Sequence, residues 1–249
     1  MITDSFDISS EPIVTPKSFY GEQKHICDIC IITFSKEIFE NVYTENNCTK
    51  IAEISACNGN ISIYSLLYEG KQVAFYLSPI GSALASQCII ETNWLIGATK
   101  FIMFGSAGSL NSEITAGKYV IPTEAYRDEG MSYHYAAPQD YIKIECANKV
   151  ADIFAKLNIP YVKGRVWTTD AMCRETQTLL QKRTNEGCIA VEMELAGVQA
   201  VCMFHGWKVY YFIVTGDVLD QPEYDISGLH KANHSFSKFD LALMIAQRI

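Results

Sequence analysis

The sequence predicts an α/β protein in which a mixed, largely parallel central sheet carries helices on both faces. Apolar residues make up 49% of the 249 residues and charged residues only 19%, which is enough apolar material for a full core. Segments with strand and helix patterns alternate along the chain. Several of these strands are apolar on both faces, as strands covered by two helix layers are.

The first half of the chain shows the pattern most clearly. Residues 1–24 are predicted as an irregular leader, and residues 25–249 as a single domain. A short apolar run at 26–34 predicts a central strand. Two further strands at 61–67 and 72–77 flank a Glu-Gly turn and predict a hairpin. Helical spacing follows at 83–96 and ends at a glycine.

The second half continues the alternation and begins with an apolar strand at 100–104, which runs into Gly105-Ser-Ala-Gly108. Further strands are expected at 119–122, 162–168 and 207–215, and helices at 146–157, 175–185, 191–204 and 229–249. Ligands of such sheets sit at the carboxyl ends of strands. We therefore expect the site in the segments that follow residues 34, 77, 104, 168 and 215.

Charge and cysteine content exclude several classes of protein. The net charge of −8 repels phosphate backbones and argues against nucleic-acid and anionic-membrane partners. No signal peptide and no membrane-length apolar stretch is recognised. The odd count of nine cysteines predicts reduced thiols in a cytoplasmic protein. The pair Cys27 and Cys30 has CxxC spacing but lacks a second pair, so buried strand cysteines are favoured over a metal or redox site.

Three short segments offer residues for chemistry. Small residues at Gly105 to Gly108 let backbone N–H groups approach a ligand, although a structural turn explains them as well. Glu192 and Glu194 open an apolar helix, where they either hold a ribose diol or complement the helix dipole. Asp217 follows the last strand and is placed for general acid catalysis or for a turn.

The stretch from Arg127 to Tyr135 gathers polar and aromatic side chains and is typical of a ligand-facing loop, although a solvated loop fits too. His134 within it is as readily structural as catalytic. The other histidines show no defensible metal-ligand pattern, and no metal or organic cofactor is expected.

Taken together and in this order, these segments resemble the nucleoside phosphorylase superfamily, which includes uridine phosphorylase, hexameric purine nucleoside phosphorylase and methylthioadenosine nucleosidase. The resemblance runs from about Cys27 to the C-terminus. Its most specific part is Val191-Glu-Met-Glu194 with Thr168-Thr-Asp170 upstream and Gly216-Asp217 downstream.

The resemblance implies a role for each matching residue. Met193 and Glu194 would contact the ribose, with Glu192 in support, and Asp217 would protonate the leaving purine. Ser106, between Gly105 and Gly108, would bind phosphate or another polar group. Thr169, Met172, Arg127 and His134 complete the expected substrate-binding set. A homodimer or homohexamer is implied as well.

The chain departs from the phosphorylases at three positions. Met103 replaces an arginine two residues before the glycine-rich segment. The segment Thr33-Phe-Ser-Lys-Glu37 replaces a Gly-Asp-Pro and a nearby arginine, and no arginine lies between Ile51 and Leu77. Phosphate would thus lack its bidentate partners, although Lys36 is a candidate substitute. Met172 and Cys173 replace aromatic residues of the base pocket.

The predicted function is cleavage of the N-glycosidic bond of a nucleoside, by phosphorolysis with inorganic phosphate as co-substrate. Phosphate-independent hydrolysis is the first alternative, and nucleoside binding without turnover is the second. Asp217 favours a purine base, whereas the Arg127–Tyr135 stretch favours uracil.

Overall fold

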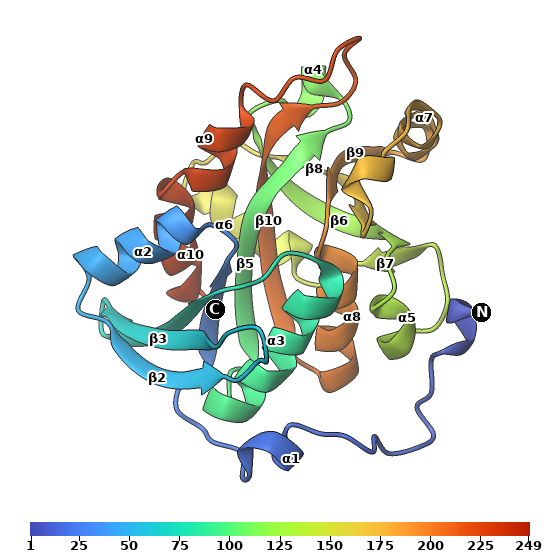
Figure 1. The fold of residues 1–249 in the computed structure, drawn as a ribbon. Helices are drawn as coiled ribbons and strands as arrows, with labels where there is room; N and C mark the ends of the chain where they lie inside the picture. The colour runs from blue at the N-terminus through green and yellow to red at the C-terminus, as the bar shows by residue number, and fades with distance from the viewer.

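The computed structural model describes residues 1–249 and contains one ten-stranded mixed sheet with helices on both faces (Figure 1). The strands are β1 (Ile29–Thr33), β2 (Thr49–Ile54), β3 (Ile61–Tyr68), β4 (Lys71–Leu77), β5 (Lys100–Ser109), β6 (Tyr119–Asp128), β7 (Tyr141–Lys143), β8 (Val162–Thr169), β9 (Cys188–Glu192) and β10 (Lys208–Val218). The α-helices are α1 (Lys17–Tyr20), α2 (Lys36–Glu45), α3 (Ser82–Ile96), α4 (Ser112–Thr115), α5 (Ser132–Tyr135), α6 (Ala147–Lys156), α7 (Gln177–Asn185), α8 (Leu195–His205), α9 (Leu229–His234) and α10 (Ser237–Ala246). Two short 3₁₀ helices are η1 (Ile2–Asp4) and η2 (Met172–Arg174).

The sheet runs in the order β10-β6-β8-β9-β5-β1-β4-β3-β2, and β10 also pairs with β5. This second pairing closes β10, β6, β8, β9 and β5 into a ring, while β1 to β4 extend from it as an open sheet. Five of the ten pairings are parallel, namely β1–β4, β1–β5, β5–β10, β6–β8 and β8–β9. The predicted mixed sheet is confirmed, and its closure into a ring is a feature that the sequence pattern did not reveal.

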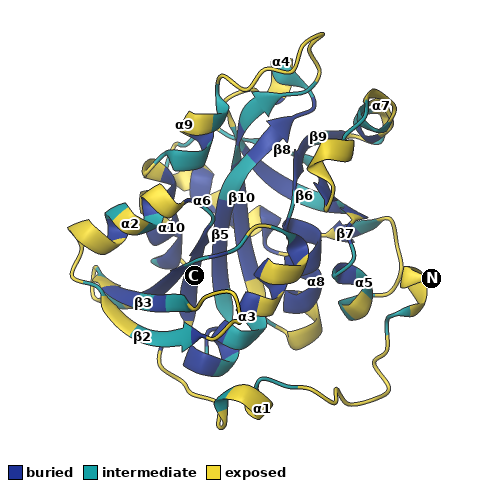
Figure 2. Cartoon of the chain, viewed as in Figure 1, coloured by how far each residue is buried: buried dark blue, intermediate teal, exposed yellow.

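Helices cover the sheet on two sides. Helices α3 and α5 each contact α8 on one face, and α2, α6, α9 and α10 pack against the other. The central strands and much of α8 form the buried interior in Figure 2, and the core cluster contains 55 buried residues. All five residues of β1 are buried, because this strand lies between β4 and β5 and is covered on both faces.

Several predicted boundaries require correction. Helix 191–204 begins instead at Leu195, because residues 188–192 form β9, whose apolar run is continuous with that of the helix. Strands β5 and β10 extend through the glycine-rich segment and through Asp217, which are therefore strand residues rather than turns. The C-terminal helix is broken into α9 and α10.

The remaining sequence predictions concern cysteines and membranes. All nine cysteines are free, and Cys27 and Cys30 are 7% and 0% exposed, which agrees with buried thiols. Among the helices, none combines the length and the apolar character needed to cross a bilayer.

Candidate active site

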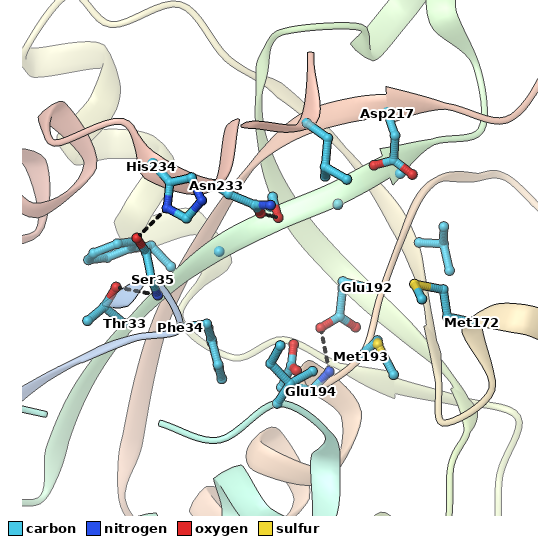
Figure 3. Close-up of a pocket in the computed structure, with 18 of the residues that line it drawn as sticks. Thr33, Phe34, Ser35, Met172, Glu192, Met193, Glu194, Asp217, Asn233 and His234 are labelled. Atoms are coloured by element: carbon cyan, nitrogen blue, oxygen red, sulfur yellow. Dashed lines mark hydrogen bonds between the residues drawn. The ribbon is translucent and has the colours of Figure 1, made fainter. Parts of the chain in front are cut away.

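A cavity of about 400 Å³ opens at the carboxyl ends of the strands (Figure 3). Every one of the five segments expected to form the site contributes to its wall. Ser35 follows β1, Ile80 follows β4, Ser106 lies in β5, Met172 follows β8 and Asp217 lies in β10. The five segments predicted to form the site therefore line one cavity.

Glu192 is the last residue of β9, and its carboxylate is fully engaged by the protein. Oε2 accepts hydrogen bonds from the backbone N–H groups of Glu194 and Leu195, both at 2.8 Å, and from the Tyr211 hydroxyl at 3.3 Å. Oε1 accepts one from the Thr168 hydroxyl. These backbone donors are the free N–H groups at the start of α8. Glu192 thus caps α8 and fixes the backbone from which Met193 and Glu194 project into the cavity.

Glu194 is 7% exposed and has one firm protein partner, the backbone N–H of Gly81, which donates to Oε1 at 2.8 Å. Gly81 has a φ of 103°, a conformation that favours glycine, and it ends the loop between β4 and α3. The other oxygen of Glu194 remains available to a ligand. Burial, followed by repulsion from Glu192, raises the pKa of Glu194 to about 8. A ligand that donates hydrogen bonds here would relieve this penalty.

A β-bulge directs Asp217 into the cavity. Thr215 pairs with Ala107 and Asp217 with Gly108, so Gly216 is the extra residue in β10. Gly216 lies against α9, where an added Cβ would come within 2.6 Å of the Ala232 Cβ. The Asp217 carboxylate accepts a hydrogen bond from the Tyr224 hydroxyl at 2.8 Å.

A second acid, Glu175, lines the cavity on the same side as Asp217. Burial, followed by repulsion from Asp217, raises the pKa of Glu175 to about 7. A carboxyl group with such a pKa is partly protonated at neutral pH and can donate a proton. Met172 lines the same cavity (Figure 3).

The opposite end of the cavity carries hydroxyl, amide and cationic groups. Ser106 donates to the Asn233 side-chain oxygen, which leaves the amide NH₂ of Asn233 free to donate. The Ser35 hydroxyl and His234 Nδ1 are 2.8 Å apart (Figure 3). Ser35 also caps α2 by accepting from the Ile38 N–H at 3.2 Å.

Lys238 provides the fixed positive charge at this end. Its side chain is 1% exposed, and its ammonium donates to the carbonyls of Gly105, Ala232 and Asn233 rather than to a carboxylate. Burial lowers the pKa of Lys238 to about 8. Its three donors are used by the backbone, so Lys238 acts on a ligand through its charge.

No arginine lines the cavity. Met103, at the position of a phosphorylase arginine, is 0% exposed in the middle of β5 and lies in the core outside the cavity wall. Lys36 does not line the cavity either, and its ammonium pairs with Glu40 at 3.5 Å. The wall therefore carries four carboxyl groups, those of Glu175, Glu192, Glu194 and Asp217, against Lys238 and His234.

Seven expected residues come together in this cavity, namely Gly105, Ser106, Gly108, Met172, Met193, Glu194 and Asp217, together with the supporting Glu192. The structure does not bring Arg127, His134 or Thr169 to it. Arg127 lies one residue before the end of β6 and is 3% exposed because its guanidinium donates to the Ser132 hydroxyl and to the carbonyls of residues 136, 137 and 139. It organises the segment that was expected to face the ligand. His134 is exposed on α5, and the Thr169 hydroxyl accepts from the Ala171 N–H.

The residues missed by the sequence analysis are Ser35, Glu175, Asn233, His234 and Lys238. Ser35 directly follows a predicted strand end, so its position was a usable signal. His230 and His234 have the i, i+4 spacing of one helix face, which was a second signal. No local sequence pattern predicts Lys238 as a site residue, because its position in the cavity wall depends on how α10 packs against β5.

Comparison with known proteins places this geometry in a family. The model of the phosphorylase superfamily matches residues 28–243, and the chain belongs to that family. The 5′-methylthioadenosine/S-adenosylhomocysteine nucleosidase of Buchnera aphidicola subsp. Schizaphis graminum is 28% identical over 189 residues, which are 72% of this chain and 75% of the relative. The DeoD-type purine nucleoside phosphorylase of Colwellia psychrerythraea is 27% identical over 164 residues, 64% of this chain and 69% of the relative.

Solved structures agree on the fold. The 5′-methylthioadenosine/S-adenosyl homocysteine nucleosidase of Campylobacter jejuni superposes with a TM-score of 0.72 at 19% identity, covering 90% of this chain and all of that one. The futalosine hydrolase of Helicobacter pylori gives 0.70 at 18% identity, covering 90% and 99%. The family and its nucleoside-cleaving relatives support the predicted cleavage of a nucleoside N-glycosidic bond.

Proposed function

We propose that this protein hydrolyses the N-glycosidic bond of a purine nucleoside, releasing the free base and the ribose. The observation that supports the proposal best is the cavity in which Glu194 and Asp217 line different parts of one wall (Figure 3). A nucleoside has a diol on its sugar and a proton acceptor on its base, and these two acids match the two ends.

The ribose end is built for charge as well as for binding. One oxygen of Glu194 is held by Gly81, and the other can accept from a ribose hydroxyl. When the bond to the base breaks, positive charge develops on the ribose, and a nearby carboxylate stabilises it. The diol's hydrogen bonds would favour the charged form of Glu194 and lower its raised pKa on binding.

The base end favours a purine. Asp217 and Glu175 are the acids of this wall, and either can deliver a proton to a base nitrogen as the electron pair of the broken bond moves onto the base. The Arg127 segment, which favoured uracil in the sequence, is engaged with its own backbone outside the cavity. With the argument for uracil set aside, the acids of the cavity favour a purine, which can leave in protonated form.

The composition of the wall favours water over phosphate as the nucleophile. A phosphate dianion entering this cavity would meet four carboxyl groups and no arginine. Losing charge-assisted contacts to an anion costs about 1.5–3 kcal/mol each. Water carries no charge and needs only hydrogen-bond partners, which Ser35, Ser106 and Asn233 offer.

Phosphorolysis is the second candidate, and the observation in its favour is Lys238. A buried ammonium without a carboxylate partner leaves a positive potential beside Ser106 and the free amide of Asn233. If phosphate is used, its half-saturation concentration should be high, because no guanidinium binds it in a bidentate manner.

Assembly into a homodimer or homohexamer forms part of the proposal. Ile80 and Met172 line the cavity and yet are 62% and 59% exposed. A second copy of the chain covering them would exclude water from the bound nucleoside. Sedimentation at micromolar concentration should show a dimer or a larger species, and a monomer would contradict a shared site.

A nucleoside panel tests the reaction. Adenosine, inosine, 5′-methylthioadenosine and uridine are incubated with and without inorganic phosphate, and free base, ribose and ribose 1-phosphate are separated by chromatography. We expect base and free ribose from purine nucleosides without phosphate. Base release that requires phosphate and yields ribose 1-phosphate would establish phosphorolysis instead.

A matched pair of variants separates turnover from binding. Glu194→Gln removes the ribose carboxylate, while Glu113→Gln changes an exposed glutamate on α4 and serves as control. Saturable nucleoside binding that depends on Glu194 but is accompanied by no product with any substrate would show a binding protein rather than an enzyme.

A further inference from the structure

Three metal-ligating side chains meet at the edge of the cavity, although the sequence analysis expected no metal. Glu37 belongs to α2, whereas His230 and His234 belong to α9. Glu37 Oε1 is 3.7 Å from His234 Nε2 and 3.9 Å from His230 Nε2, and the three ligand atoms all lie within 4.8 Å of one another. Two elements that are far apart in the sequence thus bring three ligand atoms together, one oxygen from α2 and two nitrogens from α9.

The arrangement on α9 is suited to shared ligation. Residues four apart lie on the same helix face, and the His230 and His234 rings are 4.8 Å apart between centroids. The Ser35 hydroxyl lies 2.8 Å from His234 Nδ1 and can accept a hydrogen bond from Nδ1–H, and in that tautomer the lone pair is on Nε2. A partner on the second ring nitrogen is what orients metal-binding histidines in general.

The donor set determines the class of ion. Two neutral imidazoles and one carboxylate, with a further position open, are the ligands of three-residue zinc sites. Ligand atoms around a tetrahedral Zn²⁺ lie roughly 3.4 Å apart for bonds of about 2.0–2.1 Å. The two separations from Glu37, 3.7 and 3.9 Å, exceed this by a few tenths of an ångström, and all three ligand atoms lie within 4.8 Å of one another. Glu37 and His230 have side chains that are 54% and 82% exposed, so both are free to close this gap.

The neighbouring lysines pair with other groups and not with Glu37. Lys36 pairs with Glu40, and Lys238 donates to backbone carbonyls. The carboxylate of Glu37 has the two histidines as its only charged partners. An ion pair between Glu37 and protonated imidazoles would use the same geometry, and metal titration separates the two arrangements.

We propose that Glu37, His230 and His234 bind a divalent transition-metal ion of the zinc type, which joins α2 to α9 at the end of the cavity formed by Ser35 and His234. The site requires no nucleoside and does not depend on the proposed hydrolysis. The fourth coordination position of the ion would be left for water or a small ligand.

Calorimetric titration of the tag-free protein with ZnCl₂ tests the site. We expect saturable binding of one ion per chain that weakens by more than about 100-fold in His230→Ala and in Glu37→Gln, since changes outside the ligand shell already cost 10–100-fold. His134→Ala, which removes an exposed histidine elsewhere on the surface, is the matched control and should bind as the unmodified chain does. Exposed Cys57 and Cys173 also attract Zn²⁺, so the difference between variants is decisive.

Melting temperature provides a second readout. Zn²⁺ should raise the melting temperature of the unmodified protein and of His134→Ala but not of His230→Ala, because an ion that binds only the folded chain stabilises it. His230 is a surface residue, so its replacement leaves the core intact. The proposal is overturned if the unmodified protein shows no saturable binding, or if His230→Ala binds and is stabilised as well as the unmodified chain.

Discussion

Glu194 and Asp217, two of the four acids of the cavity, differ in how the fold holds them. Glu194 is 7% exposed and sits at the start of α8, where the carboxylate of Glu192 fixes its backbone. Asp217 lies on a bulge at the end of β10, and the chain that follows it, residues 220–227, is exposed. The proposed ribose end is therefore set by the packed core, whereas the proposed base end depends on a few surface contacts. Recognition of the sugar should tolerate little change, and recognition of the base should be easier to alter.

The largest expected effect is at the base end. Asp217→Asn should lower kcat for purine nucleosides by about 10²–10⁴-fold, because protonation of the leaving group contributes this much where it is used. The loss should be small for a nitrophenyl riboside, whose leaving group needs no proton. Steady-state kinetics on both substrates provides the comparison. Equal losses would assign Asp217 a structural role in the bulge.

The ribose end gives the next largest effect. Glu194→Gln keeps the shape and the contact with Gly81 but removes the negative charge. We expect kcat to fall by about 10²–10³-fold and KM to rise, because the charge acts both on the diol and on the cationic ribose of the transition state. Unlike Asp217→Asn, this change should affect the nitrophenyl riboside as well. Unchanged kinetics would refute the ribose assignment.

Two glycines of β5 test how tightly Asp217 is positioned. A Cβ on Gly108 would lie 2.5 Å from Leu219 Cδ1, 2.9 Å from Val191 Cγ1 and 3.2 Å from Asp217 Oδ2. A Cβ on Gly105 would meet nothing closer than 3.6 Å. Gly108→Ala should therefore cost about 1–3 kcal/mol of unfolding free energy and displace Asp217, lowering kcat. Gly105→Ala is the control for adding a methyl group to the same strand, and denaturant unfolding of both compares them.

The smallest expected effect is on the pH dependence of stability, which tests how deeply Glu194 is buried. The folded-state pKa of Glu194 is about 8, above that of an unfolded glutamate, so the folded chain binds the extra proton between these values. Unfolding free energy should then fall as pH rises from about 4.5 toward 8. In Glu194→Gln this part of the slope should vanish. At pH 8 the variant should melt a few degrees higher, since 1 kcal/mol moves Tm by about 2–4 °C in chains of this size. An identical slope in both proteins would show that Glu194 titrates normally.

The parts of the fold that could be predicted were those marked by a local sequence pattern. The β3–β4 hairpin and the buried strands β1 and β10 follow from apolar runs and a Glu-Gly turn. Helix α2 was missed because only Ile38 and Val42 of its ten residues are buried, and β2 because it is an exposed edge. The sequence predicted the end of β9 and α8 as one helix, because both are apolar and periodicity cannot separate a strand from a helix within one apolar run.

The site divides in the same way. Met193, Glu194 and Asp217 lie in motifs whose order along the chain resembles that of the family. The sequence therefore predicted that these residues share one site, and all three line the same cavity. Glu175 and Lys238 acquire their character from burial and from neighbours distant in sequence, which no local pattern records. The expected ligand-facing role of Arg127 was not supported for a related reason. A guanidinium is equally suited to a ligand and to backbone carbonyls, and only the tertiary structure selects between them.

The contact between Gly216 and α9 has a consequence for substitutions at this position. Position 216 sits between Asp217, the proposed proton donor to the base, and helix α9, which carries two histidines, and an added Cβ there would lie 2.6 Å from the Ala232 Cβ. A larger residue there would push the two apart and alter both ends of the cavity at once. A substitution at this glycine is therefore expected to disturb both the proposed base end and the proposed metal site, whereas a substitution at an exposed residue such as Glu223 should disturb neither.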